Sequence, residues 1–168
     1  MLQTDLIKIR YYGKKNESKN LEFRSFLKWL DMDESEIDSI VHEINKEMAD
    51  KIDCKSCANC CKEMTPVVSE SEILRISERL GMSKEEFIRE YLKQDDEDDF
   101  LINRKPCPFL KGNLCQIYDD RPEDCRSFPH LHKEEILSRL LGVVYNCSIC
   151  PIVFNVYERL KERFRFRG

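Results

Sequence analysis

Cysteine spacing constrains this chain more than any other feature of its sequence. Nine cysteines occur among 168 residues, and the first four form a Cys-x2-Cys-x2-Cys-Cys run. Thiolates two residues apart can face one metal ion from a single turn of backbone. Soft, anionic ligands of this kind select zinc or an iron–sulfur cluster over magnesium or calcium. The sequence therefore predicts a metal–thiolate protein, and all nine cysteines are candidate ligands: Cys54, Cys57, Cys60, Cys61, Cys107, Cys115, Cys125, Cys147 and Cys150.

Disulfide bonds are the competing use of so many cysteines. The first ten residues carry Asp5, Lys8 and Arg10 and no apolar segment, so they lack the pattern of a secretory signal. We therefore expect a cytoplasmic protein with reduced thiols, and the odd number of cysteines would leave one unpaired in a full set of disulfides. Metal ligation is favoured, and structural disulfides and buried thiols remain as alternatives.

Length and composition indicate one globular domain, with or without an appended helical arm. Hydrophobic residues make up 41% of the chain and charged residues 36%, and no apolar run approaches the ~18 residues of a membrane span. The formal net charge is −4, and four thiolates around one divalent metal would add negative charge. We therefore expect a partner protein and neither a membrane nor a nucleic acid.

The N-terminal third predicts mostly helix. Residues 6–11 alternate between apolar and polar side chains and could form a strand or a loose arm. Apolar residues then recur at helical spacing over 21–30. A capping box of Asp33 and Glu36 precedes a second helical pattern that ends near residue 50.

Two further helices are expected after the cysteine run. A Ser-x2-Glu capping box opens each of them, and the helices are predicted over 69–80, ending at Gly81, and over 83–91. The acidic run 95–99 lacks the spacing of a calcium-binding loop and predicts a solvated loop. Residues 100–118 are typical of a short hairpin with turn residues at 111–113.

That hairpin would bring Cys107 and Cys115 across from each other. A short helical turn after Pro122 carries Cys125, a helix is predicted from 133 until Gly142, and Pro151 opens the last helix. The predicted fold is mainly α with a small β-hairpin, in which an irregular cysteine-rich metal-binding core is flanked by helices. The predicted domains are a helical arm or hairpin over 1–50, a cysteine-cluster domain over 51–152 and a C-terminal helix over 153–168.

Two common cysteine motifs do not fit. A bacterial ferredoxin run needs a fourth cysteine where this chain has Met64. A zinc ribbon pairs two Cys-x2-Cys knuckles across a short hairpin, whereas the second pair here, Cys147 and Cys150, lies far downstream. The fold could still bring these distant pairs together.

A longer compound pattern does fit, Cys-x2-Cys-x2-Cys-Cys followed by Cys-Pro-Phe-Leu-x4-Cys-x-Ile-Tyr-x2-Arg-Pro-x2-Cys-Arg-x-Phe-Pro. The matching residues are Cys54, Cys57, Cys60, Cys61, Cys107, Pro108, Cys115, Ile117, Tyr118, Arg121, Pro122, Cys125, Arg126, Phe128 and Pro129. Over about residues 54–150 the chain resembles the YkgJ family of cysteine-cluster proteins. The resemblance implies a zinc- or iron-chelating domain, in which Cys147 fits a further downstream cysteine and Cys150 is an addition.

Residues beside the cysteines are candidates for tuning the metal. Arg121 and Arg126 flank Cys125, where they could bind a cofactor by offsetting thiolate charge or donating to sulfur. Ion pairing with neighbouring carboxylates is the alternative. His130 and His132 could replace a thiolate, although histidines in loops more often have no such role.

Three functions follow from these observations. The first is an iron–sulfur redox carrier or an accessory to a larger enzyme, and the second is a structural zinc-binding interaction module. The third is a component of an enzyme that methylates with S-adenosylmethionine, because flagellin lysine methylases contain a similar cysteine domain. The chain has no glycine-rich nucleotide-binding segment and no recognisable catalytic set, so no catalytic residue is assigned.

Overall fold

The computed structural model describes residues 2–167 of the chain. The chain forms two compact units: unit 1 consists of residues 1–54 and 129–168, and unit 2 consists of residues 55–128. Helices predominate, and the strands form two small antiparallel pairs, so the predicted fold class is confirmed.

The domain boundaries predicted from the sequence, at 50/51 and 152/153, stay a prediction. A discontinuous unit depends on both of its segments for its core. Unit 1 is discontinuous in this sense, since its helices come from the two ends of the chain.

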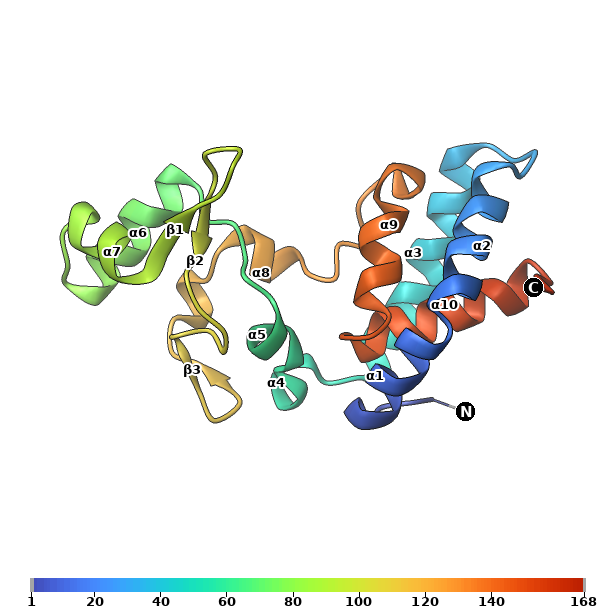
Figure 1. The fold of residues 1–168 in the computed structure, drawn as a ribbon, viewed down its shortest axis with the longest axis horizontal. Helices are drawn as coiled ribbons and strands as arrows, with labels where there is room; N and C mark the ends of the chain where they lie inside the picture. Colours follow the sequence, from blue (N-terminus) through green and yellow to red (C-terminus); the bar gives the residue numbers. More distant parts are fainter. Residues whose placement is uncertain (1, 168) are drawn as a thin grey trace. The chain divides into compact units, whose positions relative to one another are not determined.

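Unit 1 is a helical bundle (Figure 1). Its helices are α1 (Leu6–Lys15), α2 (Glu17–Lys28), α3 (Glu34–Lys51), α9 (Ile136–Asn146) and α10 (Pro151–Arg163). Helix α10 packs against α3 and α1, while α9 packs against α2 and α3. The largest fully buried side chains of this core include Tyr157, Phe23, Ile9, Leu27 and Ile37.

Helix α1 replaces the strand or loose arm expected at residues 6–11. The Asp5 carboxylate caps it by accepting hydrogen bonds from the backbone N–H groups of Ile7 (2.9 Å) and Lys8 (3.2 Å). The buried residues of α1 are Ile9 and Gly13, four positions apart, so the buried face has helical and not alternating spacing. The prediction of a strand or loose arm was wrong because it considered the alternation over residues 6–11 and not the helix cap at Asp5.

Helix α9 differs from its prediction at both ends. It begins at Ile136 and not near 133, because the Asp38 carboxylate of α3 accepts from the N–H groups of Glu135 (2.8 Å) and Ile136 (3.0 Å). It runs through Gly142 to Asn146, since Val143 and Val144 are buried. Burial of such side chains outweighs the roughly 1 kcal/mol that an interior glycine costs a helix.

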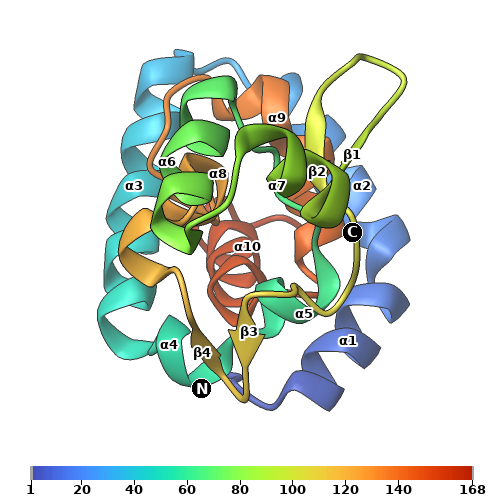
Figure 2. The ribbon, with the colours of Figure 1, turned by 90° about the vertical axis from the view of Figure 1, so that its left-hand side faces the viewer.

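Unit 2 contains short helices and two strand pairs (Figure 2). Helix α4 begins on the last residue before the unit, and the elements are α4 (Cys54–Cys57), α5 (Asn59–Glu63), α6 (Glu70–Leu80), α7 (Lys84–Tyr91), β1 (Leu92–Gln94), β2 (Phe100–Ile102), β3 (Leu110–Lys111), β4 (Leu114–Cys115), the 3-10 helix η1 (Tyr118–Asp120) and α8 (Glu123–Ser127). Their apolar core consists of Val68, Ile73, Ile76, Phe87, Leu92, Ile102, Phe109 and Ile117.

The predicted helix boundaries in unit 2 are confirmed. Capping boxes open α6 at Ser69 and α7 at Ser83, and α6 ends at Gly81 in the left-handed conformation (φ +67°). In unit 1 the last helix begins at Pro151, with Cys150 as its N-cap, as the sequence predicted. Asp33 is the N-cap of α3, but its side chain makes no capping hydrogen bond.

The predicted hairpin over 100–118 is two separate strand pairs. Strand β2 pairs with β1, and the acidic run 95–99 connects them as a loop. Strands β3 and β4 form the second pair, in which Leu110 and not Cys107 is the partner of Cys115. The turn residues were identified correctly, whereas the strand before Cys107 pairs with residues that precede the acidic loop.

No single helix among residues 2–167 is long and apolar enough to cross a membrane. Helices α9 and α10 together have the length and composition of a bent span, with 119° between them. Core helices of globular proteins share these properties, and both helices contribute buried residues to unit 1.

Candidate functional site

The nine cysteines are divided between the two units, and none of them forms a disulfide. Unit 2 holds six of them, all partly buried: Cys57, Cys60, Cys61, Cys107, Cys115 and Cys125. Cys54 is exposed at the boundary between the units, and Cys147 and Cys150 are buried in unit 1. The largest gathering of thiols therefore belongs to unit 2.

The cysteine run is bent between two helical turns. Ala58, between α4 and α5, has left-handed backbone angles (φ +47°, ψ +20°), which non-glycine residues rarely adopt. This bend places Cys57 at the end of one turn and Cys60 on the next. The carbonyl oxygen of Cys61 then accepts a hydrogen bond of 2.8 Å from the N–H of Cys107, which joins the run to the segment before β3.

Cys107 and Cys115 lie against the apolar core of unit 2. Cys115 is held by strand pairing with Leu110, and the N–H of Leu110 in turn bonds to the carbonyl oxygen of Cys107 at 3.0 Å. Two thiols thus pack against the core, and the bond from the N–H of Cys107 to Cys61 holds one of them near the end of the cysteine run.

Cys125 is positioned by carboxylates at the start of α8. A Glu72 carboxylate oxygen accepts from the N–H of Glu123, so α6 and α8 are joined. An Asp124 carboxylate oxygen accepts from the N–H of Val67 at 3.0 Å. These two bonds fix the first turn of α8, which carries Cys125 immediately afterwards.

Four of these thiols influence one another's pKa values. Burial raises the pKa of Cys107 to about 11, and the charges of Cys61 and Cys115 add to this rise. Burial also raises the pKa of Cys125 strongly, and the charges of Cys61 and Cys107 contribute to it. Because interactions between charges weaken with distance, such mutual effects occur only between nearby groups. Cys61, Cys107, Cys115 and Cys125 therefore form one electrostatically linked thiol cluster.

Cys61 is the thiol of this cluster that ionises most readily. A hydrogen bond with the Cys60 side chain lowers the pKa of Cys61 to about 7, although burial opposes this change. The positive charges of Lys62 and Arg121 also lower the pKa of Cys61. A thiolate at this position is the form that binds a metal.

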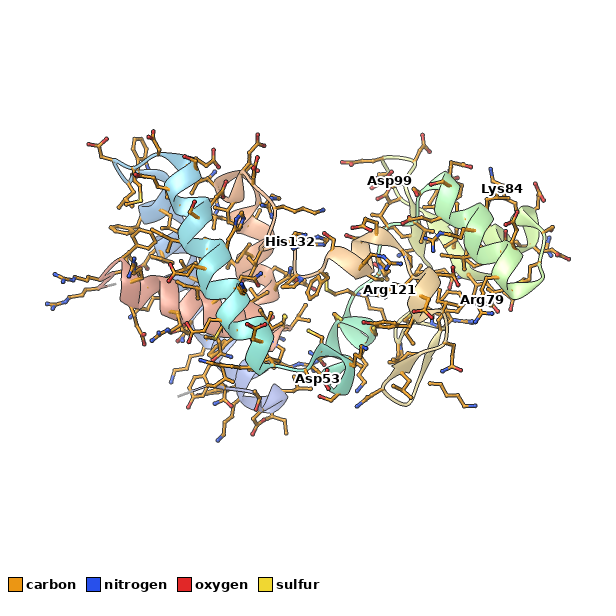
Figure 3. The ribbon with its side chains drawn as sticks, turned by 180° about the vertical axis from the view of Figure 1, so that it is seen from behind. Asp53, Arg79, Lys84, Asp99, Arg121 and His132 are labelled. Carbon is orange, nitrogen blue, oxygen red and sulfur yellow. The ribbon has the colours of Figure 1, made fainter. Side chains whose placement is uncertain are left out.

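The two arginines named from the sequence have different surroundings. Arg121, just before α8 (Figure 3), donates to the carbonyl oxygen of Tyr118, and its guanidinium carbon lies 3.8 Å from the centre of that ring. Burial raises the pKa of Cys115, and the charge of Arg121 offsets only part of this rise. Arg126 instead donates to the carbonyl oxygen of Asp119 (2.7 Å) and pairs with Glu123 (3.7 Å). A role of either arginine toward a cofactor stays a prediction.

The histidines of the sequence prediction belong to unit 1. Burial lowers the pKa of His132, and the nearby charges of His130, Lys133 and His42 act in the same direction. The His42 ring also lies 3.3 Å from the carbonyl oxygen of Lys133. His130 and His132 therefore belong to unit 1, whereas unit 2 contains six of the cysteines.

The donor atoms of unit 2 suit a soft metal by their chemistry, although their arrangement in this structure is not that of a formed metal site. Among residues 2–167, no group of three or more His, Cys, Asp or Glu side chains is arranged so that it could hold a metal ion. The donors that unit 2 gathers are thiols, which favour zinc or iron–sulfur clusters. Raised thiol pKa values mean that the ionised forms need a nearby cation, and a bound metal supplies one while protons are released.

Three residues near the cluster were not identified from the sequence. They are Glu72, which joins α6 to α8, and Lys62 and Asn113, which bond to each other. Lys62 directly follows the cysteine run, and that position was a usable signal. Glu72 was recognised as part of a capping box and Asn113 as a turn residue, and neither pattern indicates a second bond to a distant segment.

Comparison with known proteins identifies the family of this chain. Residues 53–150 match the family model CxxCxxCC, which is described as a "putative zinc- or iron-chelating domain". No solved structure matches the chain. The family match spans all nine cysteines, covers more than half of the chain and confirms the resemblance seen in the sequence. The chain therefore belongs to the CxxCxxCC family, the family of this zinc- or iron-chelating domain.

Proposed function

We propose that unit 2 binds an iron–sulfur cluster through its cysteines and that the protein acts as a redox carrier or as an accessory to a larger enzyme. One observation carries the proposal. The linked thiols Cys61, Cys107, Cys115 and Cys125 come from three separate segments of the chain, and unit 2 brings them together. A metal bound by all of them would account for this convergence, because thiols that bind nothing in common do not have to lie together.

The pattern of the run favours an iron–sulfur cluster. Cys54, Cys57 and Cys60 have the spacing of three cluster ligands, and clusters commonly take a further thiolate from elsewhere in the chain. We assign the ligands to the six cysteines of unit 2, which are Cys57 and Cys60 of the run and the linked thiols Cys61, Cys107, Cys115 and Cys125. When bound, the cluster would supply reversible electron transfer, and Lys62 and Arg121 would offset part of the negative charge of its ligands.

Zinc on the same thiolates is the second candidate, because the family description includes both metals. Four cysteines satisfy either metal, so the ligand set alone does not choose between them. A zinc site would stabilise the fold and its binding surface without redox chemistry. In both cases we expect a protein partner and a cytoplasmic location.

Metal content in matched variants tests the proposal. Cys115→Ser should lose most of the bound iron or zinc, because serine supplies no thiolate, and Cys125→Ser should do the same. Gln116→Ala is the control, since Gln116 is exposed beside Cys115 and its side chain bonds only weakly, at 3.4 Å, to the carbonyl oxygen of Leu114. Wild-type metal content in both cysteine variants would overturn the proposed site.

A further inference from the structure

Asn113 occupies the turn of the β3–β4 hairpin, two residues before Cys115. The left-handed residue of this two-residue turn is Gly112 (φ +63°), as in hairpin turns that place glycine first. Asn113 is therefore not required for its backbone conformation. Its side chain is exposed, so it is not required for core packing either.

The Asn113 side chain bonds to both sides of the cysteine run. Its Nδ2 donates to the carbonyl oxygen of Ser56 at 2.9 Å, in the turn that ends at Cys57. Its Oδ1 accepts from the Lys62 ammonium at 2.8 Å, immediately after Cys61. One amide therefore connects the hairpin that carries Cys115 to the two ends of the segment that contains Cys57, Cys60 and Cys61.

Both bonds together require an amide. The group facing Ser56 must donate, because it meets a carbonyl oxygen, and the group facing Lys62 must accept. An aspartate would keep the bond to Lys62, but its second oxygen would face the Ser56 carbonyl without a proton. An alanine would remove both bonds.

The segment between Ser56 and Lys62 contains an energetically unfavourable backbone conformation. Ala58, between Ser56 and Lys62, is buried in the left-handed conformation, which costs a non-glycine residue about 1 kcal/mol or more. A backbone hydrogen bond from the N–H of Cys107 to the carbonyl oxygen of Cys61 also joins the run to the segment before the hairpin. Loss of the amide would leave the thiols on the two sides held by fewer contacts.

We propose that Asn113 is a positioning residue that clamps the cysteine run onto the β3–β4 hairpin and thereby slows the release of the metal. The proposal rests on the proposed function, because it assumes a metal on the thiols of unit 2. Groups that orient metal ligands typically contribute 10- to 100-fold in affinity. Both bonds are exposed, so we expect an effect of about tenfold, at the lower end of that range.

The test measures the rate of zinc transfer from the full chain to a coloured chelator, with zinc(II) as a probe of the same thiolates. Asn113→Ala should release zinc about tenfold faster than the wild type. Asn113→Asp should be intermediate, because it keeps one of the two bonds. Gln116→Ala should match the wild type, since it removes an exposed polar side chain from the same hairpin without touching the run. Circular dichroism establishes that each variant is folded.

A second comparison separates positioning from general stability. On a Lys62→Met background, which already lacks the bond to Oδ1, Asn113→Ala should accelerate release by a smaller factor than in the wild type. Equal release rates for the wild type, Asn113→Ala and Asn113→Asp would overturn the inference and leave the proposed function intact. A wild-type chain that binds neither zinc nor iron would overturn both.

Discussion

Glu72 joins two helices of unit 2 through a single carboxylate. One oxygen accepts from the N–H (2.8 Å) and the hydroxyl (2.9 Å) of Ser69, and the other accepts from the N–H of Glu123. Burial by itself raises the pKa of Glu72, but these hydrogen bonds more than offset it and the pKa is lowered. The charged form is therefore the one that unit 2 stabilises, and it holds the helix that carries Cys125.

Replacing Glu72 by glutamine should destabilise unit 2 by about 1.5–3 kcal/mol, because a glutamine N–H group would face a backbone N–H. The folded pKa lies below the unfolded value of about 4.3, so the contribution is complete above that value. It is lost as the pH falls through the folded pKa, and the difference between wild type and variant should shrink in acid. Urea unfolding at neutral and acidic pH measures this, with the exposed Glu78→Gln on the same helix as control. Equal stabilities of the two variants at neutral pH would contradict it.

Arg121 should tune the cofactor more strongly than Arg126. The charge of Arg121 acts on Cys61 and Cys115, whereas Arg126 is paired with Glu123. Removing a nearby positive charge favours the oxidised cluster, so Arg121→Gln should lower the reduction potential by tens of millivolts without loss of the cluster. Arg126→Gln should lower it less. A redox titration measures both, and a larger shift in Arg126→Gln would be the opposite of what the structure predicts.

At the scale of elements, local sequence signals predicted helices well, but they did not predict which distant residues cap a helix or pair with a strand. Both Ser-x2-Glu capping boxes and Gly81 were identified, because a cap depends only on residues within one turn. The start of α9 was misplaced because Asp38, far away in the sequence, binds its first N–H groups. Strand β2 was assigned to the wrong hairpin for a similar reason, since its partner precedes the acidic loop.

Two glycines in helices of unit 1 should respond oppositely to alanine. A Cβ atom on Gly13 of α1 would lie 2.5 Å from the Ser148 Cα and 2.7 Å from the Cys147 oxygen, both backbone atoms that cannot rotate away. Gly13→Ala should therefore cost about 1–3 kcal/mol or more. A Cβ on Gly142 of α9 would meet nothing within 4 Å, so Gly142→Ala should stabilise by about 0.5–1 kcal/mol.

Thermal unfolding of the two variants beside the wild type checks this pair. The comparison is matched because both positions are helical and both changes add the same methyl group. Equal shifts of the midpoint in the same direction would contradict the close packing of α1 on the turn that contains Cys147.

At the scale of the whole molecule, the candidate ligands could be predicted from the sequence, but their grouping could not. The spacing of nine cysteines was sufficient to predict thiolate chemistry and the family, because those depend on residue type and order. The sequence did not indicate that Cys147 and Cys150 fold into a unit with the N-terminal helices. That grouping depends on packing between the two ends of the chain, which no local pattern records. Asn113 was missed in the same way, since the two residues that it bonds to, Ser56 and Lys62, lie far earlier in the chain.

The most direct test of the account is the iron, zinc and acid-labile sulfide content of anaerobically purified protein, measured together with its visible absorbance. We expect iron and sulfide, with a broad charge-transfer absorbance that decreases on reduction by dithionite and returns on careful oxidation. Stoichiometric zinc in a colourless protein without iron or sulfide would contradict the iron–sulfur proposal and establish the structural zinc site in its place.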